Sequence, residues 1–204
     1  VGAFTGAAGA IVVDRRPLPE QPAPITTIGA GYDCARFVAR QTDPKAVLEA
    51  VTVELDRDAA GTVIPGEIRY SFRGLSDQLQ RRIRRFRRFD ILLDLNGGQL
   101  EVTAMDPEFE QASDETEWAE LSAAMSVQRP LRLGPWLADL DMILPTALPV
   151  LKVDTGDNEP DSASLYIDED GGVNWQVVAW TVNDRPLHVV MNARTGLIIE
   201  RSGC

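Results

Sequence analysis

The chain has 204 residues, of which 44% are hydrophobic and 25% charged, the composition of a folded globular protein. Its 31 acidic residues outnumber its 20 lysines and arginines, which gives a formal net charge of −11. This balance argues against general affinity for nucleic acid, because phosphate binding needs clustered positive charge. The length is sufficient for one or two hydrophobic cores.

The first 24 residues are predicted to precede the folded part. Val1–Val13 contains no charged residue but is shorter than the about 20 residues that a helix needs to cross a bilayer. We interpret it as a membrane-proximal tether, the end of a signal anchor or the remnant of a signal sequence. A flexible tail, or a strand lent to a neighbouring subunit, is the alternative. Pro17–Pro24 follows as a semi-rigid spacer, because proline-rich segments favour extended geometry.

Residues 25–128 are expected to form a first α+β module. Alternating apolar residues predict its strands, and Asn96-Gly97 is a strong hairpin signal because both positions tolerate positive φ. The expected elements are a helix around Asp33–Gln41, a helix or strand over Ala46–Leu55, a turn at Asp56–Gly61, and strands at Glu67–Arg73, Asp90–Leu95 and Gln99–Thr103.

The insert Leu75–Phe89 is predicted to be a basic amphipathic helix. Leu75, Leu79, Ile83 and Phe86 are spaced by four, four and three residues, so they would share one helical face. The rest of the insert is crowded by six arginines, namely Arg81, Arg82, Arg84, Arg85, Arg87 and Arg88.

Three roles are open for these arginines. The first is internal, because the acidic run from Asp106 to Glu120 contains no basic residue and would neutralise them across the fold. The second is contact with an anionic membrane surface or an acidic protein partner, where each basic side chain is worth about 1 kcal/mol. Binding to nucleic acid is the third and weakest.

Residues 129–204 are expected to form a second α+β module. The region Pro130–Pro135 predicts a boundary, and Trp136–Leu151 predicts an apolar helix broken by its prolines. A polar loop, Asp154–Asp161, and a strand, Ser164–Ile167, come next. The segment Val173–Glu200 then alternates apolar and polar residues around two turns, which is typical of strands with one buried face.

This ending resembles the close of PepSY domains. The similarity lies in W-x-V-x-x from Trp175, a short turn, an alternating strand, and Ala193-Arg194-Thr195-Gly196 before Leu197-Ile198-Ile199. It covers about thirty residues. The resemblance implies an extracytoplasmic α+β module, a helix packed on an antiparallel sheet, of the kind found in bacterial envelope proteins and protease pro-regions.

A looser copy of the same pattern is present at Glu67–Thr103, with the arginine-rich insert inside it. A tandem duplication and a chance similarity between β-rich segments both explain it. The fold class predicted from the whole chain is therefore α+β, with two small PepSY-like or cystatin-like modules of antiparallel sheet plus helix.

The two cysteines, Cys34 and Cys204, lie near opposite ends of the chain. A disulfide between them would close most of the chain into a loop and could stabilise it by ~5 kcal/mol in the chain-entropy model. It requires an oxidising compartment, to which the resemblance also points. Two unrelated thiols are the alternative.

Catalytic and metal-binding patterns give little support to an enzyme. The single histidine, His188, is predicted on a strand, and no local sequence pairs it with Cys34. Asp168–Gly172 resembles the start of a calcium loop without the full ligand spacing, and a hairpin turn explains it better. No cofactor or metal site is predicted.

The favoured function is a non-catalytic, extracytoplasmic accessory subunit, periplasmic or at the cell surface, that docks on protein subunits of a membrane-associated complex. The six arginines and the tail Val1–Val13 are its predicted contacts. A peptidase inhibitor or pro-region-like regulator of an envelope protease is the alternative, by family analogy. A hydrolase using loop carboxylates such as Asp157 or Asp170 is a third hypothesis.

Overall fold

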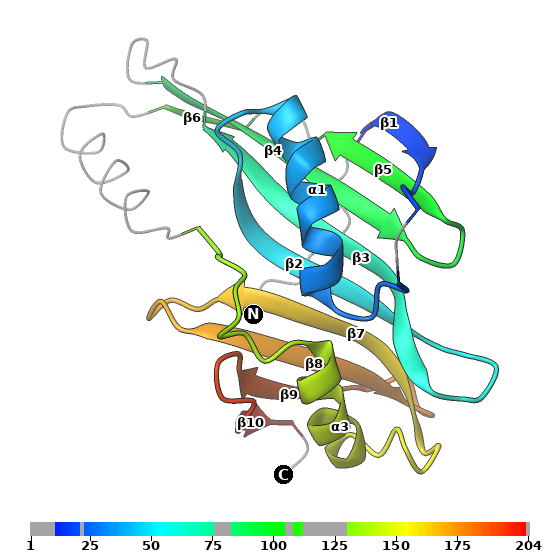
Figure 1. The fold of residues 1–204 in the computed structure, drawn as a ribbon. Coiled ribbons are helices and arrows are strands. Elements are labelled where there is room, and N and C mark those ends of the chain that lie inside the picture. The colour runs from blue at the N-terminus through cyan, green and yellow to red at the C-terminus, as the bar shows by residue number, and fades with distance from the viewer. Residues whose placement is uncertain (1–10, 21–22, 76–82, 105–107, 112–129, 203–204) are drawn as a thin grey trace.

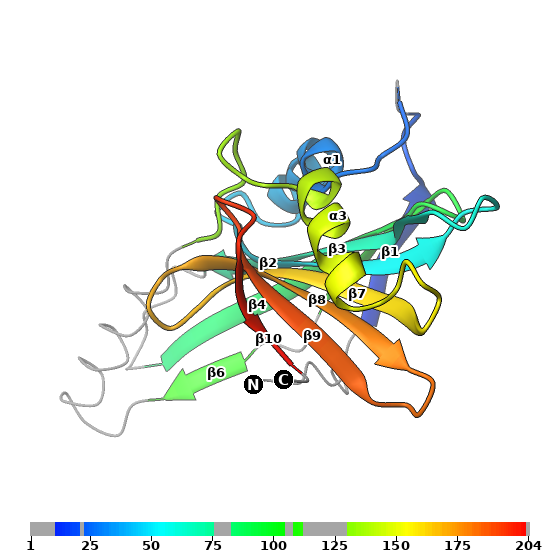
Figure 2. The ribbon, with the colours of Figure 1, turned by 90° about the horizontal axis from the view of Figure 1, so that it is seen from below.

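One antiparallel sheet runs through both halves of the chain in the computed structural model, which describes residues 11–20, 23–75, 83–104, 108–111 and 130–202. The strand order is β1-β5-β4-β3-β2-β7-β8-β9-β10, and β6 pairs with β4 off this path. Two described helices, α1 and α3, lie on the same face of the sheet (Figures 1 and 2). The elements are β1 (Ile11–Pro17), α1 (Ile28–Thr42), β2 (Val47–Arg57), β3 (Val63–Leu75), β4 (Ile83–Asp94), β5 (Gln99–Ala104), β6 (Glu108–Gln111), α3 (Leu140–Val150), β7 (Asn158–Ile167), β8 (Val173–Thr181), β9 (Pro186–Asn192) and β10 (Ile198–Arg201).

The single sheet shows that the prediction of two separate helix-plus-sheet modules was wrong. Strand β2 of the first half pairs antiparallel with β7 of the second, with Val51 opposite Leu165 and Val53 opposite Ala163. All four residues are fully buried, so parting the halves would expose an apolar row to water. The boundary predicted between residues 128 and 129 lies outside the described residues.

The two halves nevertheless repeat one order of elements, a helix followed by a four-stranded meander. Helix α1 precedes β2 to β5, and α3 precedes β7 to β10. Because the meanders meet through their first strands in antiparallel orientation, a half turn about an axis normal to the sheet relates the halves. The strands predicted before Asn96-Gly97, after it and in the C-terminal hairpins are confirmed within β3, β4, β5, β8, β9 and β10.

The local predictions for the helices need adjustment. The helix expected around Asp33–Gln41 begins earlier, at Ile28. The segment Ala46–Leu55, for which helix and strand were both open, lies in strand β2 from Val47 onward. Helix α3 is continuous although it contains Pro145 and Pro149. Its buried face, which includes Ile143 and Ala147, packs on the core and maintains the helix where the prolines remove backbone donors.

Each helix is anchored at its beginning by a buried aromatic side chain on the second strand of its own meander. The Tyr70 hydroxyl donates a hydrogen bond to the carbonyl of Ile28 at 2.6 Å. The Trp175 indole donates to the carbonyl of Ala138 at 2.8 Å. Gly31 permits the first contact, because a Cβ there would lie 2.6 Å from the Tyr70 oxygen.

A single carboxylate, that of Asp139, caps both helices. Its Oδ1 accepts from the backbone N–H of Leu140 at 2.7 Å, at the start of α3, and from Ile28 at 3.0 Å. Its Oδ2 accepts from Gly29 at 3.0 Å, in the first turn of α1. Helix N-termini carry free N–H groups and positive partial charge, so one negative group stabilises both where they meet.

The face of the sheet opposite the helices carries charged side chains in the first half. The Glu49 carboxylate lies 3.1 Å from Nε of Arg73 and 3.3 Å from Nε of Arg88. Asp90 is buried on this face, and burial raises the pKa of its carboxyl group, although a hydrogen bond from Ser71 partly offsets that rise.

Replacing Asp139 with alanine removes the N-cap of α3 and the carboxylate that accepts from Ile28 and Gly29 of α1, where Thr27 stays as the N-cap. We expect the free energy of unfolding to fall by about 2–4 kcal/mol, because three backbone N–H groups lose a charged acceptor. Urea denaturation measures the change. The matched control is Asp141→Ala, an exposed carboxylate in the first turn of α3, which should cost less than about 1 kcal/mol. Equal losses in the two variants would contradict the shared cap.

Asp90 should make the stability depend on pH. Its raised pKa means that the folded state holds the proton more tightly, so this contribution is present below the unfolded pKa and is lost as pH rises through the folded value. Asp90→Asn does not titrate. We therefore expect its stability relative to wild type to increase between pH 4 and pH 7, as measured by urea unfolding at several pH values. If the stability of Asp90→Asn minus that of the wild type stays constant or decreases over this range, burial of the charged carboxylate is not costly.

Candidate binding groove between α3 and the β2–β3 hairpin

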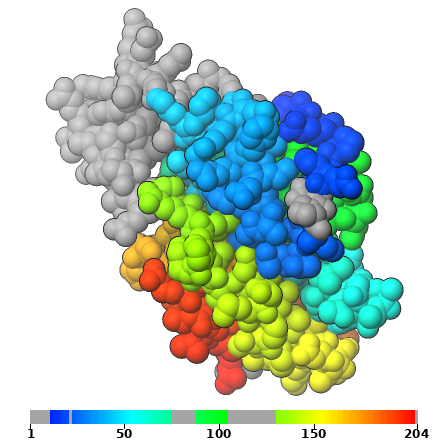
Figure 3. Space-filling model, viewed as in Figure 1, coloured from blue at the N-terminus to red at the C-terminus, as the bar shows by residue number. Residues whose placement is uncertain are grey.

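A groove of about 420 Å³ lies between helix α3 and the hairpin that joins β2 to β3. Figure 3 shows the two walls on the same side of the molecule, with the hairpin in cyan. Its volume is within the range of about 300–1,000 Å³ of small-ligand sites. The described lining residues are Thr26, Arg57, Gly61, Thr62, Val63, Ile64, Pro65, Leu140, Asp141, Leu144, Pro145, Leu148 and Asp154.

The hairpin wall is shaped by an aspartate turn. Oδ1 of Asp58 accepts from the N–H of Ala60 at 2.9 Å and of Thr62 at 2.8 Å, and Gly61 takes the positive φ of 82° that the turn requires. This confirms the turn predicted at Asp56–Gly61.

The equivalent hairpin of the second half, between β7 and β8, uses the same device. Asp168 Oδ1 accepts from the N–H of Gly172 at 2.6 Å, and Gly171 has φ of 80°. The segment Asp168–Gly172, which resembles the start of a calcium loop, is therefore a hairpin turn, as predicted.

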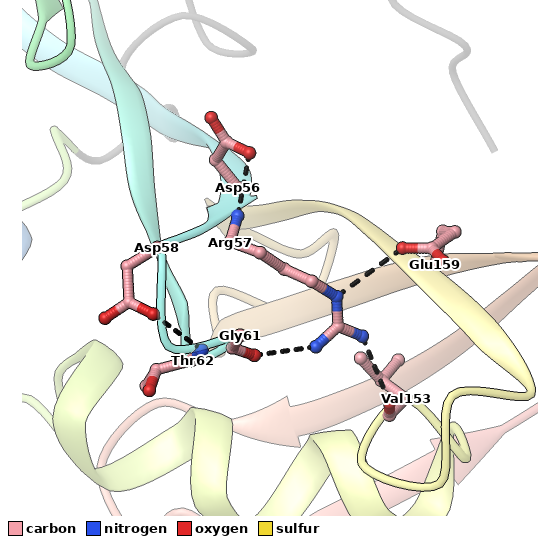
Figure 4. A network of polar contacts seen from close by, with 7 residues as sticks. All are labelled: Asp56, Arg57, Asp58, Gly61, Thr62, Val153 and Glu159. Carbon is pink, nitrogen blue, oxygen red and sulfur yellow. Dashed lines mark hydrogen bonds and ion pairs between the residues drawn. The ribbon is translucent and has the colours of Figure 1, made fainter.

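Arg57 ties the hairpin to the far side of the groove (Figure 4). Its guanidinium donates to the carbonyl of Gly61 at 2.9 Å and to that of Val153 at 3.1 Å. Its Nε lies 3.5 Å from the carboxylate of Glu159 on β7. One side chain thus connects the hairpin, the loop after α3 and strand β7, so the walls are held at a fixed separation.

The floor of the groove is apolar. Leu140, Leu144 and Leu148 follow one face of α3, with exposed fractions of 1, 7 and 8%. Val63 and Ile64, both partly exposed, face them from the start of β3. The three leucines belong to the core, so the apolar surface open to a ligand comes mainly from Pro145, Val63 and Ile64. Such a surface can bind an aliphatic group by removing it from water.

The rim of the groove is negatively charged. Asp141 on α3 and Asp154 in the following loop are exposed carboxylates, while Arg57 is the one cation among the described lining residues. Because Glu159 pairs with Arg57, the two rim carboxylates set the local potential. The groove is therefore suited to an apolar ligand that carries positive charge. No cluster of three or more metal-ligating side chains occurs in the part of the chain that the structure describes.

Four of the six arginines singled out from the sequence, Arg84, Arg85, Arg87 and Arg88, lie on strand β4. Strand β3 extends to Leu75 and β4 begins at Ile83, so the predicted helix over Leu75–Phe89 was wrong, and Arg81 and Arg82 lie outside the described residues. The segment belongs to the sheet because β4 pairs with β3 from Phe86 to Asp94.

The acidic run supplies the other partner of this strand. β6 pairs with β4 so that Glu110 lies opposite Arg84, Phe109 opposite Arg85, and Glu108 opposite Phe86. The backbone register brings the start of the acidic run beside the arginine-rich strand, and the internal role stays a prediction. Contact of Arg84, Arg85, Arg87 and Arg88 with a partner or a membrane stays a prediction.

Cys34 lies on α1 with a half-buried, free thiol whose pKa burial raises. Its proposed disulfide partner, Cys204, falls outside the described residues, so the pairing stays a prediction. His188 lies on β9, and its Nε2 is 3.6 Å from the Glu200 carboxylate on β10.

The N-terminal apolar stretch enters the sheet at its end. Ile11, Val12 and Val13 begin strand β1, which pairs with β5 of the same chain, and they are 62, 47 and 57% exposed. Residues 1–10 are outside the described part. Among the helices that the structure describes, none combines the length and hydropathy needed to cross a membrane.

Sequence reasoning missed the groove. Its walls come from residues 57–65 and 140–154, which are brought together by the β2–β7 pairing that the two-module interpretation excluded. The one available signal was the repeated aspartate-to-glycine turn at equivalent places in the two halves. No protein-family model and no curated protein matches the chain, so the groove is interpreted from its own geometry.

Replacing Arg57 with methionine keeps an unbranched apolar stem and removes the guanidinium donors. We expect the free energy of unfolding to fall by about 1–2 kcal/mol, because two carbonyl contacts and one ion pair are lost. Amide hydrogen exchange should also accelerate in residues 151–157 and 58–62. The control is Arg69→Met, which breaks an exposed ion pair with Glu67 at 3.2 Å. Its free energy of unfolding should fall by less than about 1 kcal/mol. Unchanged exchange in both segments would show that Arg57 does not hold the groove.

Proposed function

We propose that this protein is a non-catalytic accessory subunit that docks, outside the cytoplasm, on a membrane-associated complex through the groove between α3 and the β2–β3 hairpin. The observation that carries the proposal is the open apolar floor between walls held by Arg57 and by the shared cap at Asp139. A preformed concave surface of this kind binds without paying for reorganisation.

The far end of the sheet supports the same role. Strand β10 ends the described strand order, and all four of its residues are exposed. Leu197, just before the strand, is 67% exposed, and Ile199, within it, is 58% exposed. Aliphatic residues on a terminal strand favour protein contact, since such an edge offers backbone donors and acceptors to another chain.

The location remains part of the proposal. Exposed aliphatic residues of β1 continue the apolar N-terminal stretch, which is the segment expected to lie near a membrane. The accessory role therefore combines a membrane-proximal end with a groove on the helix face of the sheet.

Site-specific photo-cross-linking in native membranes tests this role. A benzophenone side chain placed at Thr62, which is exposed on the groove wall, should form discrete adducts with membrane-complex subunits, identified by mass spectrometry. The same group at Asp170, on the equivalent exposed hairpin of the second half, is the matched control and should not.

The pattern of adducts decides between functions. Adducts from Thr62 that disappear when Ile64 is replaced by glutamate support docking through the groove. A single protease attached at Thr62 would instead support the inhibitor alternative. Identical adducts from both positions, or none from either, would contradict the proposal.

A further inference from the structure

We infer that the groove binds an extended segment of a partner protein in which aliphatic side chains alternate with arginine or lysine. The inference rests on the proposed function, because it names the ligand class for the same groove. It is carried by a counterpart elsewhere in the fold and by the charge of the rim.

The half turn that relates the two halves gives the groove a counterpart. It exchanges α3 with α1 and the β2–β3 hairpin with the β7–β8 hairpin, so the counterpart lies beside α1 on the side of the β7–β8 hairpin. In all three overall views the segment from residue 130 to 137 runs there, alongside α1 (Figures 1 to 3).

The chain covers this counterpart with its own extended segment. The N–H of Leu131 donates to the carbonyl of Leu48, at the start of β2, at 2.8 Å. Leu131 is 2% exposed within the core, and Leu133 packs against the same core, while Arg132 between them is exposed. A Leu-Arg-Leu segment thus lies beside α1 (Figure 1) and is bonded to the start of β2, with its two leucines against the core and its arginine exposed.

The groove on α3 is also backed by core leucines but is left open by the described residues. Leu144 and Leu148 line it with little exposed surface, and the exposed Pro145 and half-buried Ile64 add the apolar surface that a ligand can reach. Its volume of about 420 Å³ fits the side chains of a short segment rather than a folded element.

The rim selects the charge of the ligand. Asp141 and Asp154 stand at the opening, whereas the guanidinium of Arg57 is occupied by two carbonyl oxygens and by Glu159. Positive side chains that point outward from a bound segment would meet these two carboxylates. The net charge of −11 also favours the approach of a basic segment over an acidic one.

Synthetic peptides test the inference in solution with the full chain. The probe is a capped peptide with the sequence of residues 130–136, Pro-Leu-Arg-Leu-Gly-Pro-Trp, added in trans and followed by isothermal titration calorimetry. One comparison peptide carries glutamate in place of its arginine, and another carries serine in place of both leucines. We expect saturable binding of the probe and at least about tenfold weaker binding of each comparison peptide.

Matched protein variants assign the binding to the groove. Asp141→Lys combined with Asp154→Lys should lower the affinity for the probe peptide by about tenfold, because two carboxylates that attract its arginine are replaced by positive charges that repel it. Thr62→Trp should abolish binding by filling the groove from an exposed position. The control is Glu169→Lys combined with Asp170→Lys, which makes the same change in net charge at the exposed tip of the β7–β8 hairpin and should leave affinity unchanged. Circular dichroism of each variant establishes that it is folded.

The outcomes separate this inference from the proposed function. Equal affinity for the arginine and glutamate peptides, equal weakening by the control variant, or no saturable binding at about 1 mM peptide would overturn the ligand class. If groove-dependent adducts still formed in membranes, the accessory role would stand with a different ligand. Peptide binding that depends on the groove, without membrane adducts, would support the ligand class and reject the accessory role.

Discussion

The meeting of two helix N-termini on one carboxylate is the constraint on which this fold depends. Helices α1 and α3 belong to different halves of the chain, and Asp139 accepts hydrogen bonds from both. Thr27 completes the first turn of α1 by accepting from Ala30 at 3.3 Å. The arrangement fixes the helices end to end above the β2–β7 seam. Tyr70 and Trp175 then set their height over the sheet by binding the carbonyls at their starts. The positions of both helices therefore follow from polar contacts at one small region.

The groove is a consequence of that placement. Helix α3 is held from its N-terminus, and the β2–β3 hairpin extends past the end of β4, which pairs with β3 from Glu67 onward. The hairpin thus stands beside α3 without a strand between them, and Arg57 sets the gap through Val153. Pro145 on α3 and Val63 and Ile64 on the hairpin side keep part of their apolar surface exposed in this gap. The site is thus built by rigid elements, which is what a binding surface requires if affinity is not to be lost in ordering it.

The sequence predicts the features that depend on residues close together in the chain and misses those that depend on contacts between distant strands. Alternation and turn chemistry located most strands, because both are local, and the Asn96-Gly97 hairpin is an example. The helix predicted for the arginine-rich segment was wrong. Its apolar residues Leu75, Leu79, Ile83 and Phe86 fit helical spacing, but pairing of β4 with β3 and β6 decides the structure. The two-module prediction failed for the same reason. Nothing local to Val51 or Leu165 indicates that they face each other, and the groove depends on that pairing.

The seam between β2 and β7 also has a consequence for how the chain folds. Thr52 and Ser164 lie opposite each other but 112 residues apart in the sequence. Each meander needs only short turns, whereas the seam has to close this long loop, and non-local pairing of this kind slows folding. Both meanders can therefore form while the apolar edges of β2 and β7 are still open. During that interval β2 of one molecule can pair with β7 of another, which would give a domain-swapped dimer with the same interface. The symmetry that builds one sheet from two halves thus also provides a route to joining two chains.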